Sequence, residues 1–205
     1  MKMNKIEKYL DKLFPDPKCE LNYNKDYELL IAVVLSAQTT DKRVNSVTSI
    51  LFKKYPTIID LANADVNSIA EIIKPIGTYH KKAIFVKEIA NILVNNYEGK
   101  VPNDRKKLES MPGVGRKTTN VVLSNLFLVP TIAVDTHVSR VSKRLGLADN
   151  SDDVSEIELK LMKKFAKKNW SKRHHQMVLF GRYYCKAVAP LCSGCKLKNI
   201  CKNNK

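Results

Sequence analysis

The stretch that decides the fold is Met111–Asn120, which reads MPGVGRKTTN. The preceding residues, DRKKLES, predict a short helix that Asn103 can cap. The residues from Arg116 to Phe127 predict a longer helix, and Val129-Pro130 ends it. A short helix, Pro-Gly-Val-Gly and a long helix together are typical of a helix-hairpin-helix.

The two glycines of this connection, Gly113 and Gly115, allow backbone angles that a β-carbon would forbid. Successive N–H groups beside a helix N-terminus can then hold a phosphate, so Gly113, Val114, Gly115 and Arg116 are candidate DNA-backbone contacts. The same tetrapeptide also occurs as a plain helix connector. A nucleotide-binding P-loop is excluded, because Arg116 stands where its glycine would precede the lysine.

Helical periodicity continues through most of the chain. Apolar residues from Ile6 to Phe14 recur at helical spacing until Pro15, and YELLIAVVLSA, with Asp26 as its expected cap, is apolar on all sides. Such a helix belongs at the centre of a core. Further helices are expected near 41–54, 65–73, 79–97, 136–146, 154–168 and 173–184. No segment alternates as a strand would, so the predicted fold class is all-α.

The chain is strongly basic. Its 205 residues carry a formal charge of +16 and a pI near 9.6, which favours a polyanion such as nucleic acid as partner. A biased composition with lysines on solvated helix faces is the alternative. The longest apolar run, Leu29 to Leu35, is too short to span a bilayer, and the N-terminus lacks a signal-peptide run. We therefore expect a cytoplasmic protein without membrane contact, and we also expect a monomer.

Lys117 and Asp135 are the candidate catalytic residues. Lys117 lies in the first turn of the predicted helix, where the helix dipole and Arg116 disfavour its charged form and make the amine a better nucleophile. A simple phosphate contact is the alternative for this lysine. Asp135 follows an apolar run in TIAVDTHVSR and is also the expected N-cap of the next helix.

Four cysteines close the chain with the spacing C-x6-C-x2-C-x5-C: Cys185, Cys192, Cys195 and Cys201. Four thiolates at this spacing can wrap one metal centre, and from spacing alone zinc is as good a candidate as an iron–sulfur cluster. Paired disulfides are disfavoured in an intracellular protein. Cys19 is left over as an ordinary thiol.

The pairing of MPGVGRKTTNVV with PTIAVDTHVSRV resembles the endonuclease III family of DNA glycosylases. LLIAVVLSAQTTD, PIGTYHKKA and the cysteine motif extend the resemblance from about Leu21 through Cys201. It implies a [4Fe–4S] cluster on the four cysteines, and a bifunctional DNA glycosylase and AP lyase. Lys117 would attack C1′ of a damaged nucleotide and Asp135 would assist. The expected partner is double-stranded DNA with oxidised pyrimidines or abasic sites.

The resemblance also implies two helical domains with a DNA groove between them. A six-helix barrel would span 21–132, with the helix-hairpin-helix at about 104–127. The cluster domain would join 1–20 to 133–205.

Three further DNA contacts rest on the resemblance. Gln38 matches a position that fills the hole left by a flipped-out base, although a helix cap or a solvated side chain is its plainer interpretation. Thr78 stands where the family commonly places a leucine wedge, and it could instead cap the helix starting near Tyr79. Relatives often carry several basic residues between the first two cysteines, but KAVAPL holds only Lys186.

Two other functions stay open at this point. An adenine-mismatch glycosylase would normally lack the lysine and carry a further C-terminal domain, and this chain ends soon after Cys201. A non-enzymatic iron–sulfur protein that binds DNA would need only the hairpin, the charge and the cysteines. Lys117 together with Asp135 argues against the second.

Overall fold

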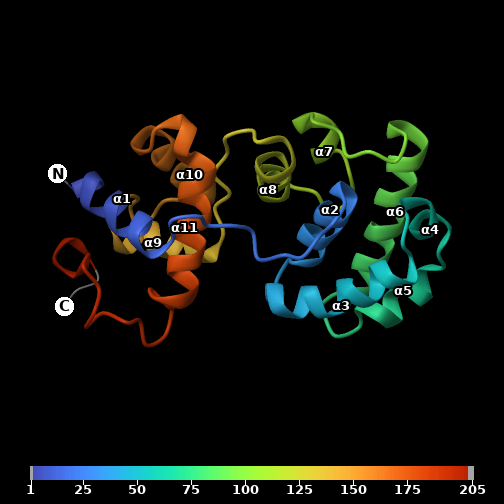
Figure 1. Ribbon diagram of the computed structural model, residues 1–205, viewed down its shortest axis with the longest axis horizontal. Coiled ribbons are helices and arrows are strands. Elements are labelled where there is room, and N and C mark those ends of the chain that lie inside the picture. Colours follow the sequence, from blue (N-terminus) through green and yellow to red (C-terminus); the bar gives the residue numbers. More distant parts are fainter. Residues whose placement is uncertain (1, 203–205) are drawn as a thin grey trace. The chain divides into compact units, whose positions relative to one another are not determined.

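The computed structural model describes residues 2–202, and every regular element in that range is a helix, so the all-α prediction is confirmed. The elements, labelled in Figure 1 where there is room, are α1 (Lys2–Leu13), α2 (Asp26–Leu35), α3 (Asp41–Lys54), α4 (Ile58–Asn63), α5 (Val66–Ile73), α6 (Tyr79–Tyr97), α7 (Arg105–Glu109), α8 (Arg116–Phe127), α9 (Thr136–Arg144), α10 (Val154–Lys164), η1 (Lys167–Asn169), α11 (Trp170–Tyr183) and η2 (Lys198–Ile200). None of the described helices is both long and apolar enough to cross a membrane.

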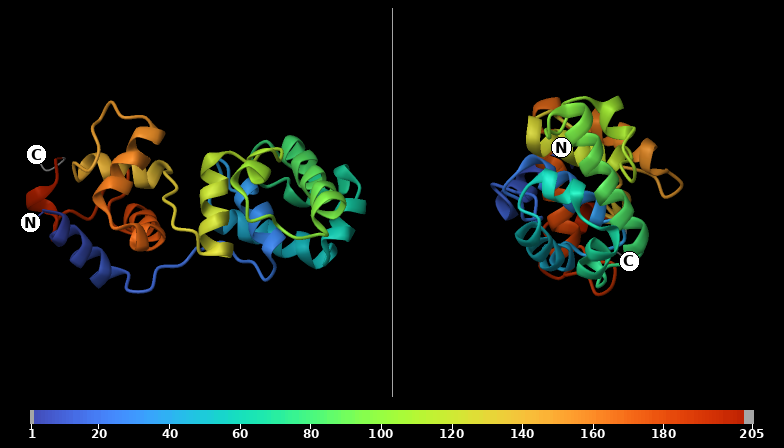
Figure 2. Two further views of the ribbon diagram at one scale, coloured as in Figure 1. Left: turned by 90° about the horizontal axis from the view of Figure 1, so that it is seen from above. Right: turned by 90° about the vertical axis from the view of Figure 1, so that its right-hand side faces the viewer.

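The chain divides into two compact units. Cys19–Phe127 forms the first, here called the hairpin unit, and it contains α2 to α8. The described parts of Met1–Lys18 and Leu128–Lys205 form the second, here called the cysteine unit, with α1, α9, α10 and α11. Figure 2 shows the helices of each unit from two further directions.

The hairpin unit is built around α2. Every residue from Tyr27 to Leu35 is buried, as its all-round apolarity predicts, and α2 contacts α3, α6 and α8. The long helix α6 packs in turn against α4 and α5. The hairpin helix α8 is therefore fixed directly on the most buried helix of its unit.

Two predicted helix caps are wrong. Asp26 is the first residue of α2, whose N-cap is Lys25, because the Asp26 Oδ2 atom instead accepts a hydrogen bond of 2.9 Å from the Val101 backbone. The cap of α7 is Asp104 rather than Asn103. Asp104 caps α7 in the ordinary way, since its Oδ1 atom accepts from the Lys107 N–H at 2.9 Å. Lys25 makes no such side-chain bond, and its own N–H donates to the Glu28 carboxylate at 3.3 Å.

One helix is absent from the prediction, and others differ from it at their ends, such as α11, which begins at Trp170 rather than at 173. The short helix α4 was not expected, since its six residues are too few to show a clear period. A box formed by Thr57 and Asp60 nevertheless caps it. The helix expected over 154–168 ends at Lys164, where Phe165 adopts an extended conformation before η1.

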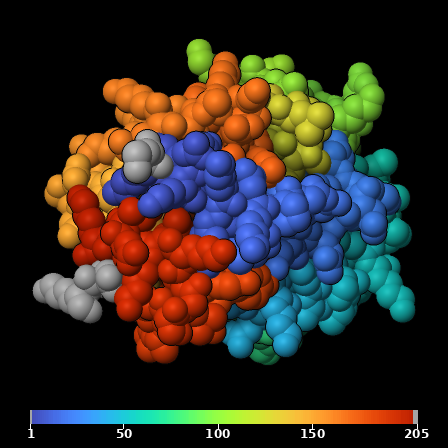
Figure 3. Space-filling view, turned by 60° about the vertical axis from the view of Figure 1, so that its left-hand side comes forward, coloured from blue at the N-terminus to red at the C-terminus, as the bar shows by residue number. Residues whose placement is uncertain are grey.

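The core of the cysteine unit lies between α1, α9, α10 and α11. Ile6 and Leu10 from α1 are fully buried against residues such as Val138 and Phe180. The segment after α11, red in Figure 3, lies beside α1, and the Tyr9 hydroxyl reaches the Gly194 carbonyl at 3.5 Å. The N-terminal helix thus helps to hold the segment that carries the cysteines.

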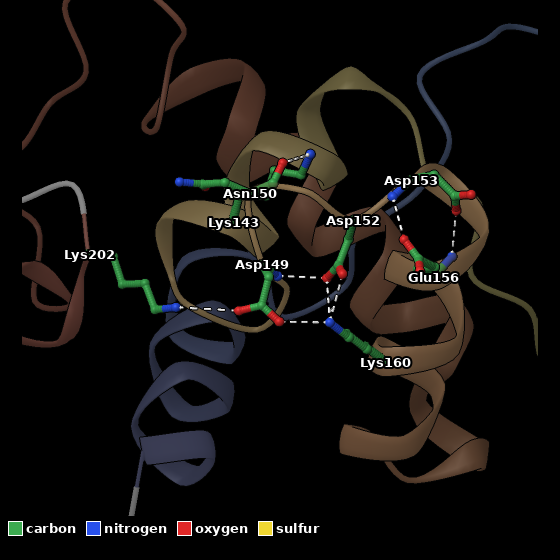
Figure 4. A network of polar contacts seen from close by, with 8 residues as sticks. All are labelled: Lys143, Asp149, Asn150, Asp152, Asp153, Glu156, Lys160 and Lys202. Carbon is green, nitrogen blue, oxygen red and sulfur yellow. Dashed lines mark hydrogen bonds and ion pairs between the residues drawn. The ribbon is translucent and has the colours of Figure 1, made fainter.

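A polar network fastens the turn between α9 and α10 (Figure 4). The Lys160 ammonium group lies 2.7 Å from carboxylate oxygens of both Asp149 and Asp152. These contacts raise the pKa of Lys160 and lower the pKa of each aspartate. Lys202 joins the network through Asp149 at 3.7 Å, so the chain just beyond the last cysteine is tied to the same turn.

Candidate active site

The hairpin connection turns on Gly113, whose φ is +73°. A β-carbon at Gly113 would lie 2.6 Å from the Phe85 ring on α6, so both conformation and space require glycine. Gly115 differs, because the described residues with positive φ do not include it and a β-carbon there would meet no atom within 4 Å. The prediction that both glycines serve the turn is therefore wrong for Gly115, which instead leaves open space beside the start of α8.

Two buried apolar side chains anchor the hairpin connection. Met111 and Val114 are buried, and the Val114 N–H donates to the Met111 carbonyl at 3.2 Å. Gly113, Gly115, Arg116 and Lys117 are exposed on the same short segment. Of the predicted DNA contacts, Val114 is therefore poorly suited, because its side chain is buried and its N–H already donates within the hairpin. The Arg116 side chain, in contrast, is exposed.

The two hairpin helices are locked together by Arg105. Its guanidinium donates to the Asn120 side chain at 2.6 Å and pairs with Glu109 at 2.8 Å. Asn120 is fully buried and lies three residues after Lys117 on α8. The helix that carries Lys117 in its first turn is thus held in place by the contact between Arg105 and Asn120.

Asp135 caps α9, as predicted. Its Oδ1 atom accepts a hydrogen bond of 2.7 Å from the Val138 N–H. The residues before it, Ile132 to Val134, are buried, so the chain enters the cap from the core of the cysteine unit. Asp135 thus belongs to the cysteine unit, and Lys117 belongs to the hairpin unit.

Gln38 and Thr78 share an unusual backbone conformation in the hairpin unit. Gln38 has φ +55° and Thr78 has φ +54°, and both residues are exposed. Thr78 occupies the N-cap position of α6, as its alternative interpretation expects, but its side chain makes no cap bond because its hydroxyl donates to the Gly77 carbonyl. The left-handed backbone turns the hydroxyl away from the N–H groups of the following helix.

The four cysteines line one pocket at the end of the cysteine unit. Apolar and aromatic side chains surround them, including Leu145, Phe180 and Tyr184. Burial raises the pKa of the Cys195 thiol, and the nearby thiols of the other three cysteines act in the same direction. Within residues 2–202, no three candidate ligands converge closely enough to hold a single metal ion.

Two arginines of α9, which the sequence analysis missed, hold the start of the cysteine segment. Arg140 donates to the Cys185 carbonyl at 3.0 Å. Arg144 donates to the Lys186 carbonyl at 2.6 Å and to the Cys185 sulfur at 3.4 Å. The backbone carbonyl of Arg144 also accepts from the Lys202 N–H at 2.7 Å. The helix that Asp135 caps therefore contacts the chain on both sides of the cysteine motif.

The predicted contact Lys186 is exposed at the beginning of this loop. Its neighbours are apolar, and Val188 exposes 83% of its surface. Lys186 is therefore the only basic side chain that the loop between the first two cysteines presents.

The comparisons with known proteins all identify the same protein family. A family model described as HhH-GPD superfamily base excision DNA repair protein matches residues 31–167. Endonuclease III of Bacillus subtilis (strain 168) is 46% identical over 205 residues, which cover 98% of this chain and 94% of the relative. Endonuclease III of Escherichia coli (strain K12) is 43% identical over 188 residues, which cover 92% of this chain and 89% of that relative.

Solved structures agree with the sequence matches. A trapped endonuclease III–DNA covalent intermediate superposes with a TM-score of 0.94 at 48% identity, covering 98% of this chain and 96% of that one. A non-covalent endonuclease III–DNA complex gives the same values. The residues that the family model matches include the hairpin, Lys117 and Asp135.

Proposed function

Because the chain belongs to the endonuclease III family of HhH-GPD base excision DNA repair proteins, it is a DNA glycosylase and AP lyase, and we propose that a Schiff base on Lys117 carries its chemistry. The observation that carries the proposal is an exposed lysine in the first turn of α8, directly after a phosphate-binding type of hairpin. The covalent endonuclease III–DNA intermediate among the similar structures supports a covalent step here.

The hairpin positions the DNA backbone for this step. The first N–H groups of a helix such as α8 have no partner within the helix, and such groups bind a phosphate without reading base sequence. The open space beside Gly115 lets a phosphate approach closely, and the exposed Arg116 side chain adds charge. A nucleotide held in this way lies beside Lys117, two residues after Gly115.

The reaction begins once the damaged nucleotide is flipped out of the duplex, which costs a few kcal/mol and less for a damaged base. The Lys117 amine bonds to C1′ while the bond between C1′ and the base breaks, and the base leaves with the electron pair. Opening of the sugar ring gives an imine between Nζ and C1′. Loss of a C2′ proton then breaks the bond from C3′ to oxygen and cuts the strand 3′ of the lesion.

Asp135 assists this chemistry in one of two ways. It accepts a proton from the amine, or it stabilises the positive charge that develops on the sugar. Its Oδ1 atom is engaged in the α9 cap, and this bond fixes the orientation of the carboxylate. Oδ2 is the oxygen assigned to the reaction.

Substrate preference is proposed from the family. We assign oxidised pyrimidines and abasic sites in double-stranded DNA as substrates. Gln38 fills the space left by the flipped nucleotide, and Thr78 lies at the wedge position. The shared left-handed backbone of two exposed residues supports a special role, since such conformations cluster at functional sites.

A [4Fe–4S] cluster is proposed for the four cysteines. The four cysteines line one apolar pocket, and their spacing, which resembles that of the endonuclease III family, favours a cluster over zinc. Arg144 donates to the Cys185 sulfur, as hydrogen-bond donors commonly do at cluster ligands. The cluster would organise the segment after α11, with its coordination sphere closed by four thiolates.

Strand incision tests the proposal. Wild-type protein should cut duplexes that contain thymine glycol or an abasic site, whereas Lys117→Ala should lose at least about a hundredfold in rate. Lys163→Ala, which removes an exposed lysine from α10, is the matched control and should cut normally. Full incision by Lys117→Ala would refute the assignment of the nucleophile.

A further inference from the structure

Lys82 is a buried lysine on α6 that the proposed chemistry does not use. Only 4% of its surface is exposed. Its ammonium group donates to the Leu35 carbonyl at 2.9 Å, the Ala37 carbonyl at 2.7 Å and the Thr39 hydroxyl at 3.3 Å. An ammonium has three N–H groups, so these oxygens satisfy all of them.

The acceptors surround Gln38. Ala37 precedes it, Thr39 follows it, and Leu35 is the last residue of α2, whose carbonyl has no partner within the helix. Gln38 itself is exposed with φ +55°. Such a conformation costs roughly 1–3 kcal/mol and persists only where the surroundings hold it. Lys82 supplies that support on both sides of the residue.

The backbone of Lys82 contacts the second loop. Its N–H donates to the Thr78 carbonyl at 3.1 Å, in the first turn of α6. Thr78 also has a left-handed backbone, with φ +54°. One residue therefore bonds to Thr78 through its main chain and to both neighbours of Gln38 through its side chain.

The need to fill this volume does not by itself explain why residue 82 is a lysine. A methionine of similar length would occupy the same volume without removing a charge from water, which is costly even when the charge is hydrogen-bonded. All three acceptors are neutral oxygens, so the bonds offset the desolvation without an opposite charge. The lysine instead provides directed bonds to a turn that is strained.

We propose that Lys82 is a positioning residue that sets the spacing and conformation of the loops carrying Gln38 and Thr78, so that both enter the DNA together. The inference rests on the proposed function, because it assumes that these two residues replace a flipped nucleotide. Lys82 touches no DNA and acts through the loop between α2 and α3.

The primary test is Lys82→Met, with Lys87→Met as its control. Lys87 lies on the same helix and donates to the Ala64 carbonyl at 2.6 Å, in a loop remote from Gln38 in the sequence. The readout is the ratio of incision rates on duplex and single-stranded abasic DNA at one salt concentration. Lys82→Met should lower this ratio by about tenfold, since insertion matters only in the duplex, and Lys87→Met should not change it.

A double-mutant cycle with Gln38→Ala separates positioning from a general loss of stability. If Lys82 acts through Gln38, the Gln38→Ala change should lower the ratio much less in the Lys82→Met background than in wild type. Additive effects would overturn the proposal. Thr39→Val, which removes one acceptor and leaves the lysine, should lower the ratio by about twofold and covers the case in which Lys82→Met does not fold.

The wild-type protein distinguishes failure of this inference from failure of the proposed function. No incision of abasic duplex by the wild type would reject the proposed function itself. Normal incision by the wild type together with an unchanged ratio in folded Lys82→Met would reject only the role of Lys82.

Discussion

At the scale of single residues, Gly113 and Gly115 show how two identical residues in one motif do different things. Gly113 lies against the Phe85 ring with a left-handed backbone, so it connects the hairpin to α6. Gly115 has open space around it at the start of α8. The first glycine serves the fold, and the second leaves the open surface at which we propose that a phosphate binds.

Alanine should therefore have a different effect at each glycine: a loss of stability at Gly113 and a loss of DNA binding at Gly115. Gly113→Ala should lower the free energy of unfolding by about 1–3 kcal/mol, because a β-carbon would be strained and would collide with Phe85. Gly115→Ala should leave stability unchanged and weaken binding to DNA. Urea unfolding of both variants checks the first statement, and equal stability would contradict it.

Residue identity predicted part of the candidate site. The hairpin, Lys117 and the Asp135 cap could be recognised because glycine, lysine and aspartate occur at fixed distances from helix starts. Lys82 could not, since HKKA offers two adjacent lysines and only the packing of α2 against α6 decides which one is buried. Burial is a property of the tertiary structure, and local sequence specifies it weakly.

At the scale of elements, α1 and α11 are joined by a charged contact across the cysteine unit. Arg173 is buried and donates to Asp11 at 2.8 Å, and Gln176 donates to the same carboxylate at 3.0 Å. The Arg173 guanidinium is the main cause that holds the pKa of Asp11 far below its usual range. Stability from this contact is therefore present above the unfolded pKa of about 3.9 and is lost as pH falls below it.

Asp11→Asn should reduce the free energy of unfolding at pH 7 by about 1–2 kcal/mol, a modest value because the carboxylate is partly exposed. The difference from wild type should shrink as pH drops below about 4. Asp16→Asn is the control, since Asp16 pairs with Lys18 in full exposure. A pH-independent effect of Asp11→Asn would show that the charge is not its origin.

The cysteine segment gives a prediction about composition. Purified protein should be yellow-brown and contain about four irons per chain. Cys192→Ser should lose colour and iron and unfold the segment after α11, whereas Cys19→Ser should keep both because Cys19 lies in the other unit. Colourless protein with one tightly held zinc would contradict the cluster.

Contacts between residues that lie far apart in the sequence could not be predicted from local patterns. Arg140 and Arg144, four residues apart on α9, have the spacing of a solvated helix face, yet both donate to the cysteine segment. The chain that they hold follows some 40 positions later, so no local pattern reports the contact. The same limit explains the wrong cap at Asp26, whose partner Val101 is distant in sequence.

At the scale of the whole molecule, the features that account for DNA binding differ from those that a covalent reaction needs. The formal charge of +16 and the hairpin account for binding to the phosphate backbone at any sequence. A protein that only binds DNA would need nothing more. The proposed covalent reaction at a damaged nucleotide requires in addition a nucleophile, which we assign to Lys117 in the first turn of α8.

Borohydride trapping tests that central claim most directly, because it reduces an imine between an amine and the opened sugar to a stable bond. Wild-type protein incubated with an abasic duplex and borohydride should form a covalent protein–DNA adduct. Lys117→Ala should bind the same duplex and form none. An adduct at wild-type level with Lys117→Ala, or no adduct from wild-type protein that binds the duplex, would contradict the account.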